Sequence, residues 1–477
     1  METKMAAEVP IHIMLVSFPA HGHVNPLLRL GKHLASKGCF VTFSTAECFS
    51  TQMQATNTSS PTPIGNGFFN FEFFQDGLGD DDPKRHSLSD YIAHLQLVGN
   101  QVISQMIKKH AEEKFPVSCI INNPFLPWVC DVATEHRIPC ALYWIHSAAT
   151  FTACYHYFKK LSLFPTHSEP YIDVQLPGIV LKHNEIPDFL HPFTPVPLLK
   201  TLVMQQFENL SKTLCVFMDT FEELEHGYIN YLSKFYPIKP VGPLFKNPIS
   251  LSTKNINDFL KLDEDCINWL NSRPPASVVY VSLGTIVSLS IEQVGEFAYA
   301  LLNSQASFLW VLRPSQREEA MKCNVLPNGF FERTSERGKV VEWSPQEEVL
   351  AHPSVACYLT HCGWNSTVEA LASGVPMLTF SQWGDQVTNA KFIVDVYGVG
   401  IRVGHNLREK KIITRDEIMR FFLEATVGPK AEELKINALK WKNAAEAARS
   451  HGGSSDRNLD AFMEDVKKLI HIKMTPQ

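Results

Sequence analysis

The sequence predicts an α/β protein with two doubly wound parallel sheets that face each other across a cleft. Short runs of β-branched and other apolar residues alternate with helical patterns, the alternation starts again after residue 260, and a polar, weakly periodic stretch separates the halves. Parallel strands buried on both faces read as continuous apolar runs, and their crossovers place helices on both faces of the sheet. Ligands of such sheets bind outside the carboxyl ends of the strands. We therefore expect the functional site between the two sheets.

The individual elements follow in chain order. In the first half the patterns predict strands at 11–17, 41–44, 118–121 and 141–145, and a helix at 27–36 that Gly38 closes. In the second half they predict strands at 278–283, 308–312, 340–342, 355–360 and 375–380. The stretch 237–257, rich in Pro, Asn, Ser and Lys, is typical of a linker, and GGSSD at 452–456 predicts an N-cap and a last helix to about residue 470. We therefore expect an N-terminal domain (1–245), a linker (246–262), a C-terminal domain (263–453) and a C-terminal helix (454–477).

The composition excludes several classes of function. The 477 residues are 45% apolar, which is enough to bury one or two large cores. A formal net charge of −6 gives no basic surface for nucleic acid or an anionic membrane. The N-terminus lacks the cationic region of a secretory signal, and no apolar run reaches the roughly 18–20 residues of a membrane span. The eleven cysteines, with no CxxC pair, favour reduced thiols, so we expect a cytoplasmic protein. We also expect a monomer.

The most informative stretch is the segment 343–386, which carries the parts of a nucleotide-sugar site in chain order. Trp343 supplies an aromatic platform, and an apolar strand then breaks at Gly363 into a helix. A glycine turn lets the backbone approach a phosphate, and the N-terminus of the helix holds the negative charge. Glu369, one turn further, is placed to accept hydrogen bonds from a ribose diol, and Asp385 beside an amide suits a sugar. Each part alone also fits ordinary packing, but their order favours a site.

This segment closely resembles the C-terminal signature box of plant family-1 UDP-glycosyltransferases. The resemblance implies the fold called GT-B, whose last helix crosses back onto the N-terminal domain, and UDP-glucose as the donor. It implies that the uracil, ribose and glucose of the donor are held by Trp343, Ser344, Gln346, Glu369, Asp385 and Gln386, with Trp364 nearby. The charge of the leaving diphosphate would be met by Ser282, Thr285, His361, Gly363, Asn365 and Ser366. A Rossmann dehydrogenase is excluded because no GxGxxG motif follows the first strand of either half.

The N-terminal half supplies the candidate acceptor site. Residues 18–26 (FPAHGHVNP) predict a turn between a strand and a helix, with His21 and His23 at its tip. The spacing alone also fits two histidines that merely face solvent. The family pattern is similar here and implies that His23 is the general base, a role that suits an imidazole because its ordinary pKa lies near the working pH. His21 and Ser147 are further acceptor-pocket candidates, and we expect the lining from 69–97 and 146–193.

Asn123 stands where the family pattern has the aspartate that orients the histidine. An amide can accept the imidazole N–H but cannot stabilise an imidazolium as a carboxylate does, and in a serine protease the equivalent change costs about 10⁴ in rate. A phenol with a pKa of about 10 needs about 4 kcal/mol to lose its proton at pH 7, whereas a carboxylic acid is already ionised. Together with INNPFLPW and VGPLFKNP, this asparagine resembles the subgroup that makes 1-O-acylglucose esters of hydroxycinnamic and gallic acids, and also limonoid glucosyltransferases.

Three functions fit these residues. The first is inverting transfer of glucose from UDP-glucose to the carboxylate of small aromatic acids, which gives 1-O-β-glucose esters. The second is transfer to hydroxyls of flavonoids, other phenolics or limonoids. The third is a UDP-sugar binder without catalysis, against which the intact His23 argues. No cofactor or metal is expected, because the acidic stretches 80–82 and 263–265 lie in polar sequence away from the phosphate region.

Overall fold

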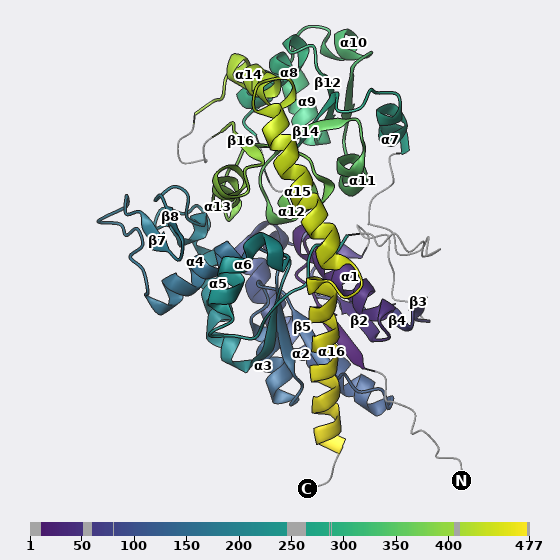
Figure 1. Cartoon of the computed structure of the whole chain (residues 1–477). Helices are drawn as coiled ribbons and strands as arrows, with labels where there is room; N and C mark the ends of the chain where they lie inside the picture. The colour runs from purple at the N-terminus through teal and green to yellow at the C-terminus, as the bar shows by residue number, and fades with distance from the viewer. Residues whose placement is uncertain are drawn as a thin grey trace.

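The computed structural model describes residues 11–50, 60–79, 81–245, 264–285, 287, 289–404 and 411–474. Within them, two helix-covered parallel sheets form a lower and an upper unit in Figure 1. The expected linker, 246–262, lies outside the described residues. No helix in the described ranges is long and apolar enough to cross a membrane.

The first sheet has the strand order β10-β9-β6-β5-β1-β2-β4-β3, and its pairs are parallel except for the edge pair β3–β4. From β1 the chain moves outward through β2 and β4, and from β5 it moves the other way. The topological switch point therefore lies between the central strands β1 and β5, where ligands of open α/β sheets bind. The strands are β1 (His12–Val16), β2 (Phe40–Ser44), β3 (Thr62–Ile64), β4 (Gly67–Phe71), β5 (Cys119–Asn122), β6 (Cys140–Trp144), β9 (Thr213–Met218) and β10 (Ile238–Pro240).

The second sheet is wholly parallel, with the order β13-β12-β11-β14-β15-β16. Its switch point lies between β11 and β14, for the same topological reason. The strands are β11 (Val278–Ser282), β12 (Ser307–Val311), β13 (Gly338–Val341), β14 (Val355–Thr360), β15 (Met377–Thr379) and β16 (Gly400–Arg402). A separate antiparallel hairpin joins β7 (Val174–Leu176) and β8 (Ile179–Leu181). The two large sheets, each doubly wound and covered by helices, form the GT-B architecture.

Helices connect the strands and cover both sheets (Figure 1). The first unit contains α1 (His21–Ser36), α2 (Leu88–Glu112), α3 (Trp128–Glu135), α4 (Ala148–Lys159), α5 (Pro197–Glu208) and α6 (Glu222–Leu232), and the short turns η1 (Glu47–Phe49), η2 (Pro83–His86), η3 (Asp188–Leu190) and η4 (Asn209–Lys212). The second contains α7 (Glu264–Asn271), α8 (Ile291–Asn303), α9 (Pro314–Lys322), α10 (Phe330–Thr334), α11 (Gln346–Ala351), α12 (Trp364–Ser373), α13 (Gln386–Lys391), the π-helical turn η5 (Phe392–Val396), α14 (Arg415–Thr426) and α15 (Ala431–Arg449).

The last helix, α16 (Ser454–Met474), runs from the upper unit down along the lower one (Figure 1). Its residues Leu459, Phe462 and Val466 are buried in the same apolar cluster as strands of the first sheet. The Phe462 ring packs edge-on against Phe217 of β9, with 4.7 Å between ring centroids. The chain thus ends by packing against the unit in which it began.

Several sequence predictions need correction. The first helix begins at His21 rather than at residue 27, so the two histidines lie in its first turn and not at the tip of a loop. The start of the stretch predicted as linker is the edge strand β10, which was missed because it is short and contains Pro240. The final helix reaches Met474, beyond the expected end near residue 470.

Candidate active site

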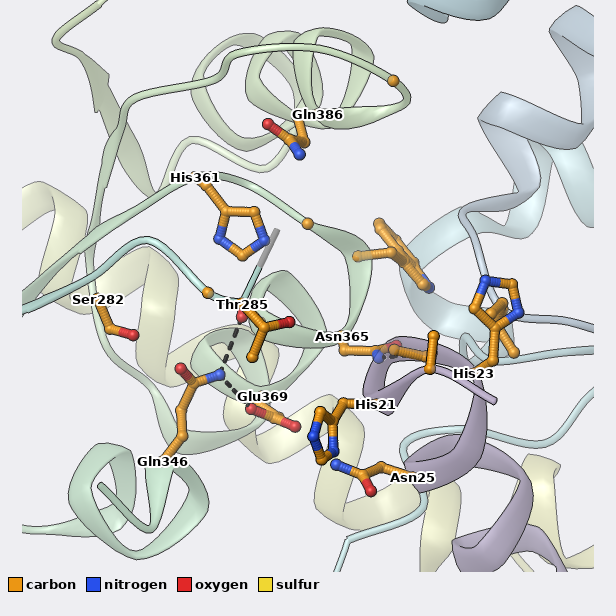
Figure 2. A pocket seen from close by; sticks show the side chains of 18 of the residues that line it. His21, His23, Asn25, Ser282, Thr285, Gln346, His361, Asn365, Glu369 and Gln386 are labelled. Atoms are coloured by element: carbon orange, nitrogen blue, oxygen red, sulfur yellow. Dashed lines mark hydrogen bonds between the residues drawn. The ribbon is translucent and has the colours of Figure 1, made fainter. Parts of the chain in front are cut away.

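A cavity of about 550 Å³ lies between the two sheets, at the carboxyl ends of their central strands. The loops that follow β1, β11 and β14 contribute to its lining, so the two switch points face one another across it. Figure 2 shows His21, His23 and Asn25 of α1 on one side and residues of the second unit on the other. The predicted site residues that line it are His21, His23, Ser282, Thr285, Trp343, Ser344, Gln346, His361, Gly363, Trp364, Asn365, Ser366, Glu369, Asp385 and Gln386.

His23 is buried in the first turn of α1, beside the ring of Phe125 at a centroid distance of 4.3 Å. The pKa of His23 is lowered to about 3, chiefly by burial and also by His146, and the interaction with Asn123 offsets only part of this lowering. The imidazole is therefore neutral at neutral pH. Asn123 follows β5, is fully buried behind the cavity rather than in its lining, and donates from Nδ2 to Ser17 Oγ at 3.2 Å. Its Oδ1 and the Nδ1 of His23 both lack a hydrogen bond of normal geometry.

His361 follows β14, and two glycines make room for its ring. A Cβ at Gly284 would lie 2.7 Å from His361 Cε1, and a Cβ at Gly363 would come within contact distance of Nε2. The intervening Cys362 has a φ of 65°, an uncommon conformation that turns the chain sharply from strand to helix. Burial lowers the pKa of His361 to about 4, against a smaller opposing effect of Asp385, so its imidazole is neutral near pH 7.

The N-terminus of α12 joins the two units. Asn365 Nδ2 donates to the carbonyl of Gly22 at 3.1 Å, and Trp364 Nε1 donates to the carbonyl of Asp219 at 2.7 Å. The Gly22 carbonyl can accept this bond because the residue four positions on is Pro26, which has no N–H to donate within α1. A proline inside the helix thus leaves an acceptor for a side chain from the opposite unit.

Gln346 lies at the centre of a hydrogen-bond network below the cavity. Its Nε2 donates to Ser366 Oγ at 2.9 Å and to Glu369 Oε2 at 2.6 Å, as Figure 2 shows by dashed lines. Its Oε1 accepts from the hydroxyls of Tyr358 at 3.0 Å and Tyr280 at 3.4 Å. In the structure these bonds occupy the Gln346 amide and fix its orientation.

Trp343 and Ser344 lie on the same side of the cavity, just after β13. The Ser344 hydroxyl is buried and lies 2.8 Å from the Tyr280 hydroxyl. The His21 ring lies near both Trp343 and Phe49, with centroid distances of 6.3 and 4.9 Å. Although predicted as an acceptor-pocket residue, His21 is therefore adjacent to the expected base platform.

Asp385 and Gln386 begin α13 at the far end of the cavity. Asp385 Oδ2 accepts from Asn389 Nδ2 at 2.9 Å and lies 3.0 Å from His146 Nδ1. Burial alone would raise the pKa of Asp385, but His146 and the hydrogen bonds outweigh it and hold the pKa below its ordinary value. Gln386 Oε1 accepts from the backbone N–H of Gln382 at 3.0 Å. The amide nitrogen of Gln386 can therefore donate to a ligand in the cavity, which Gln386 lines.

Four buried side-chain atoms around the cavity lack a hydrogen-bond partner: His23 Nδ1, Asn25 Oδ1, His361 Nδ1 and Asn365 Oδ1. Buried polar groups in native proteins are nearly always satisfied, and an exception calls for an explanation such as a catalytic role or a binding partner. Their position at both switch points indicates a polar ligand that spans the two units.

The first unit also contributes an apolar part of the lining. Phe18, Phe125 and Ile145 come from loops and strand ends of the first unit, while Val196, Leu199 and Val203 lie at or in α5. The expected acceptor segments contribute only Leu88, His146 and Phe189. Ser147 does not line the cavity: its hydroxyl caps α4 by accepting from the Thr150 N–H at 3.1 Å.

Sequence reasoning missed Arg29 and Asn25, both of which line the cavity. Asn25 lies in the FPAHGHVNP motif, so the motif itself offered a signal. Arg29 lies on α1 two turns beyond His23 and ion-pairs with Glu347 and Glu369 of the second unit, and no local pattern indicates such contacts.

Within the described ranges, no group of three or more His, Cys, Asp or Glu side chains is arranged to hold a metal ion. Asp82 accepts from the Lys84 N–H and caps η2, and Asp265 ion-pairs with Lys339. Of the two acidic stretches, residues 80 and 263 lie outside the described ranges.

Comparison with known proteins agrees with this geometry. A family model described as UDP-glucoronosyl and UDP-glucosyl transferase matches residues 82–414. The chain is 56% identical to limonoid UDP-glucosyltransferase of Citrus unshiu, over 97% of this chain and 91% of that one. It is 56% identical to gallate 1-beta-glucosyltransferase 84A24 of Punica granatum (97% and 90% covered) and 52% identical to cinnamate beta-D-glucosyltransferase of Fragaria ananassa (98% and 84% covered).

Solved structures of similar chains share the fold. Os79 from O. sativa in complex with UDP superposes with a TM-score of 0.82 at 27% identity, covering 95% of this chain and 100% of that one. Phytolacca americana UGT2 complexed with UDP-2fluoro-glucose and pterostilbene gives a TM-score of 0.77 at 25% identity, with 96% and 99% covered.

Proposed function

This chain belongs to the UDP-glucoronosyl and UDP-glucosyl transferase family, and we propose that it transfers glucose from UDP-glucose to the carboxylate of small aromatic acids such as gallate and hydroxycinnamates. The product is a 1-O-β-glucose ester. Gallate and cinnamate are the acceptors named for two relatives that are 56% and 52% identical over nearly the whole chain. The proposal rests on what the cavity offers to an acceptor oxygen.

The observation that carries the proposal is the pairing of His23 with an amide instead of a carboxylate. His23 is buried and its pKa is about 3, so its imidazole is a weak proton acceptor, and the Asn123 amide stabilises an imidazolium less than a carboxylate would. An acceptor hydroxyl would need a stronger base. A carboxylate needs none, because it is ionised throughout the neutral range.

In the proposed reaction an acceptor carboxylate oxygen attacks C1 of the glucose as the bond from C1 to the diphosphate breaks. Attack from the opposite face inverts the α-linked sugar to the β product, and no proton is transferred. The neutral His361 imidazole and the N-terminus of α12 meet the charge that develops on the UDP. His23 and Asn123 position the acceptor, and residues of the segment 343–386 hold the donor.

The domain roles form part of this proposal. Residues 1–245 bind the acceptor, 263–453 bind the donor, and the C-terminal helix 454–477 fastens the two parts together. No metal or cofactor takes part, and the protein acts as a cytoplasmic monomer with small-molecule substrates.

Hydroxyl acceptors form the second candidate. The similarity to a limonoid UDP-glucosyltransferase and the largely apolar lining of a cavity of about 550 Å³ favour it, because a bulky apolar acceptor has room there. This second function uses the same donor site as the first, but a hydroxyl oxygen of the acceptor attacks the glucose instead of a carboxylate oxygen.

The first test is an assay of the purified protein with UDP-glucose, excess EDTA and a panel of acceptors that includes gallate, cinnamate, p-coumarate, a flavonol and a limonoid. We expect glucosylated acids that mild alkali cleaves, because an ester is alkali-labile and a phenolic glucoside is not. Alkali-stable products would favour the hydroxyl reading. No turnover with any acceptor, despite UDP binding, would favour a sugar-nucleotide binder.

A further inference from the structure

Arg29 connects the acceptor-side helix α1 to two carboxylates of the opposite unit. Its Nη2 lies 2.8 Å from Glu369 Oε1 and also contacts Glu347 Oε1. The side chains of Arg29, Glu347 and Glu369 are only 14%, 14% and 7% exposed. The contact is therefore a largely desolvated ion-pair group, in which geometry matters more than at a protein surface.

The two oxygens of Glu369 are held from different directions. Oε1 takes the bond from Arg29 of the first unit, and Oε2 takes the bond from Gln346 Nε2 of the second unit at 2.6 Å. Gln346 is itself fixed by Tyr358 and Tyr280. Without Arg29, one carboxylate oxygen would lose its partner, and Glu347 and Glu369 would lie close together with no cation between them. Like charges at this distance repel, so the carboxylates would move apart or take up a proton.

We infer that Arg29 is a positioning residue for the ribose of the donor and acts through Glu369. This inference rests on the proposed function, in which Glu369 accepts hydrogen bonds from the ribose hydroxyls. Arg29 fixes the carboxylate in the orientation that receives the diol. Recognition of the nucleotide by the second unit therefore depends on a side chain from the first.

The inference predicts a defect confined to the ribose. The test compares UDP-glucose with thymidine diphosphate glucose, whose deoxyribose lacks the 2′-hydroxyl, in wild type, Arg29→Met and Arg29→Lys. The extra methyl group of thymine is common to all three comparisons, so the change in donor preference between variants reports on the hydroxyl. For Arg29→Met we expect KM for UDP-glucose to rise about tenfold with kcat nearly unchanged, the pattern of lost uniform binding. The preference for UDP-glucose over thymidine diphosphate glucose should fall by a similar factor. Arg29→Lys keeps the charge but not the planar fork, and should lie between the two.

Lys37→Met is the matched control. Lys37 is the C-cap residue of the same helix and ion-pairs with Asp456 and Asp460 of α16, both at 2.6 Å, but it does not line the cavity. Its loss removes a contact between α1 and a distant part of the chain without touching Glu369. We expect the donor preference of Lys37→Met to equal that of wild type.

The inference is overturned if Arg29→Met raises KM equally for both donors, or if Lys37→Met lowers the donor preference as much. If Arg29→Met does not fold, as a thermal melt would show, an unchanged preference in Arg29→Lys overturns it equally. The proposed function fails separately, through absence of turnover by the wild type with UDP-glucose.

Discussion

The residue opposite His23 decides how strong a base this site can offer. With Asn123 behind it, the buried imidazole has a pKa of about 3 and stays neutral across the physiological range. A carboxylate at position 123 would favour the imidazolium and raise that pKa, since an opposite charge nearby stabilises the charged form. In the proposed mechanism, an amide instead of a carboxylate at position 123 therefore favours acceptors that need no base.

Asn123→Asp should therefore raise activity toward hydroxyls selectively. We expect kcat/KM for a phenol to increase about tenfold or more, part of the 10²–10⁴ typical of general base catalysis, and kcat/KM for the matched acid to change little. Initial rates with p-coumarate and its decarboxylated phenol would measure both. An equal change for the two acceptors would refute the argument from the base.

The pH dependence provides a second check on His23. Because its pKa in the folded protein is lowered from 6.5 to about 3, the unfolded chain binds more protons between these values. The contribution of His23 to stability is thus complete above pH 6.5 and is lost as the pH falls toward 3. We expect kcat for acids to show no inflection from His23 between pH 5 and 8, and Asn123→Asp to introduce a rising limb with hydroxyl acceptors. An inflection near pH 6.5 in the wild type would contradict the neutral imidazole.

At this scale the sequence predicted the residues that belong to contiguous motifs. His23 and Asn123 were assigned from the resemblance of their motifs to the family pattern, and the segment 343–386 was assigned from the order of its parts. Arg29 was not, because its partner Glu369 lies 340 positions away and only the docking of the two units brings them together. Ser147, a candidate for the acceptor pocket, instead caps α4 and does not line the cavity, and a helix cap and a pocket residue look alike in sequence.

At the element scale, the turn between β14 and α12 needs glycine at positions 284 and 363, because a Cβ at either position would collide with the His361 ring. Gly363→Ala would place a Cβ against Nε2 and force the ring to move. We expect kcat/KM for UDP-glucose to fall about 100-fold, the cost of losing one group that stabilises developing charge. Kinetics with the standard acid acceptor would measure the loss.

Gly227→Ala is the control for this change, because a Cβ there meets nothing within 4 Å. It should leave kcat/KM and the melting temperature nearly unchanged. If Gly363→Ala retained full activity, the role of His361 in meeting the charge of the UDP would be wrong.

The elements also show where sequence patterns fail. Nine strands, namely β1, β2, β5, β6 and β11 to β15, were predicted within a few residues because their apolar runs are continuous, and β14 was predicted at its observed bounds. The strands β3, β4, β9, β10 and β16 were not predicted. The start of α1 was missed because Gly22 and Pro26 are helix breakers in an isolated chain. The helix tolerates Pro26 because the carbonyl that loses its usual donor is satisfied by Asn365 of the other unit.

At the scale of the whole molecule, α16 returns the chain from the second unit to the first. Its buried residues Leu459, Phe462 and Val466 complete the core of the first unit although they lie at the end of the sequence. The same helix is joined to α1 by the ion pairs of Lys37 with Asp456 and Asp460. Removal of a buried side chain from α16 should therefore weaken the first unit without altering the donor site.

Phe462→Ala tests this coupling. Phe462 is fully buried against Phe217, and truncation of such a ring costs about 3–5 kcal/mol through lost burial and the cavity left behind. We expect a clear fall in the midpoint of thermal unfolding, with KM for UDP-glucose unchanged below the transition. Ile472→Ala on the same helix, where the side chain is 70% exposed, should shift the midpoint little. Equal shifts for the two variants would show that α16 is only loosely attached, and the two units would then have to be held together chiefly by contacts at the cleft, such as those of Arg29 and Asn365.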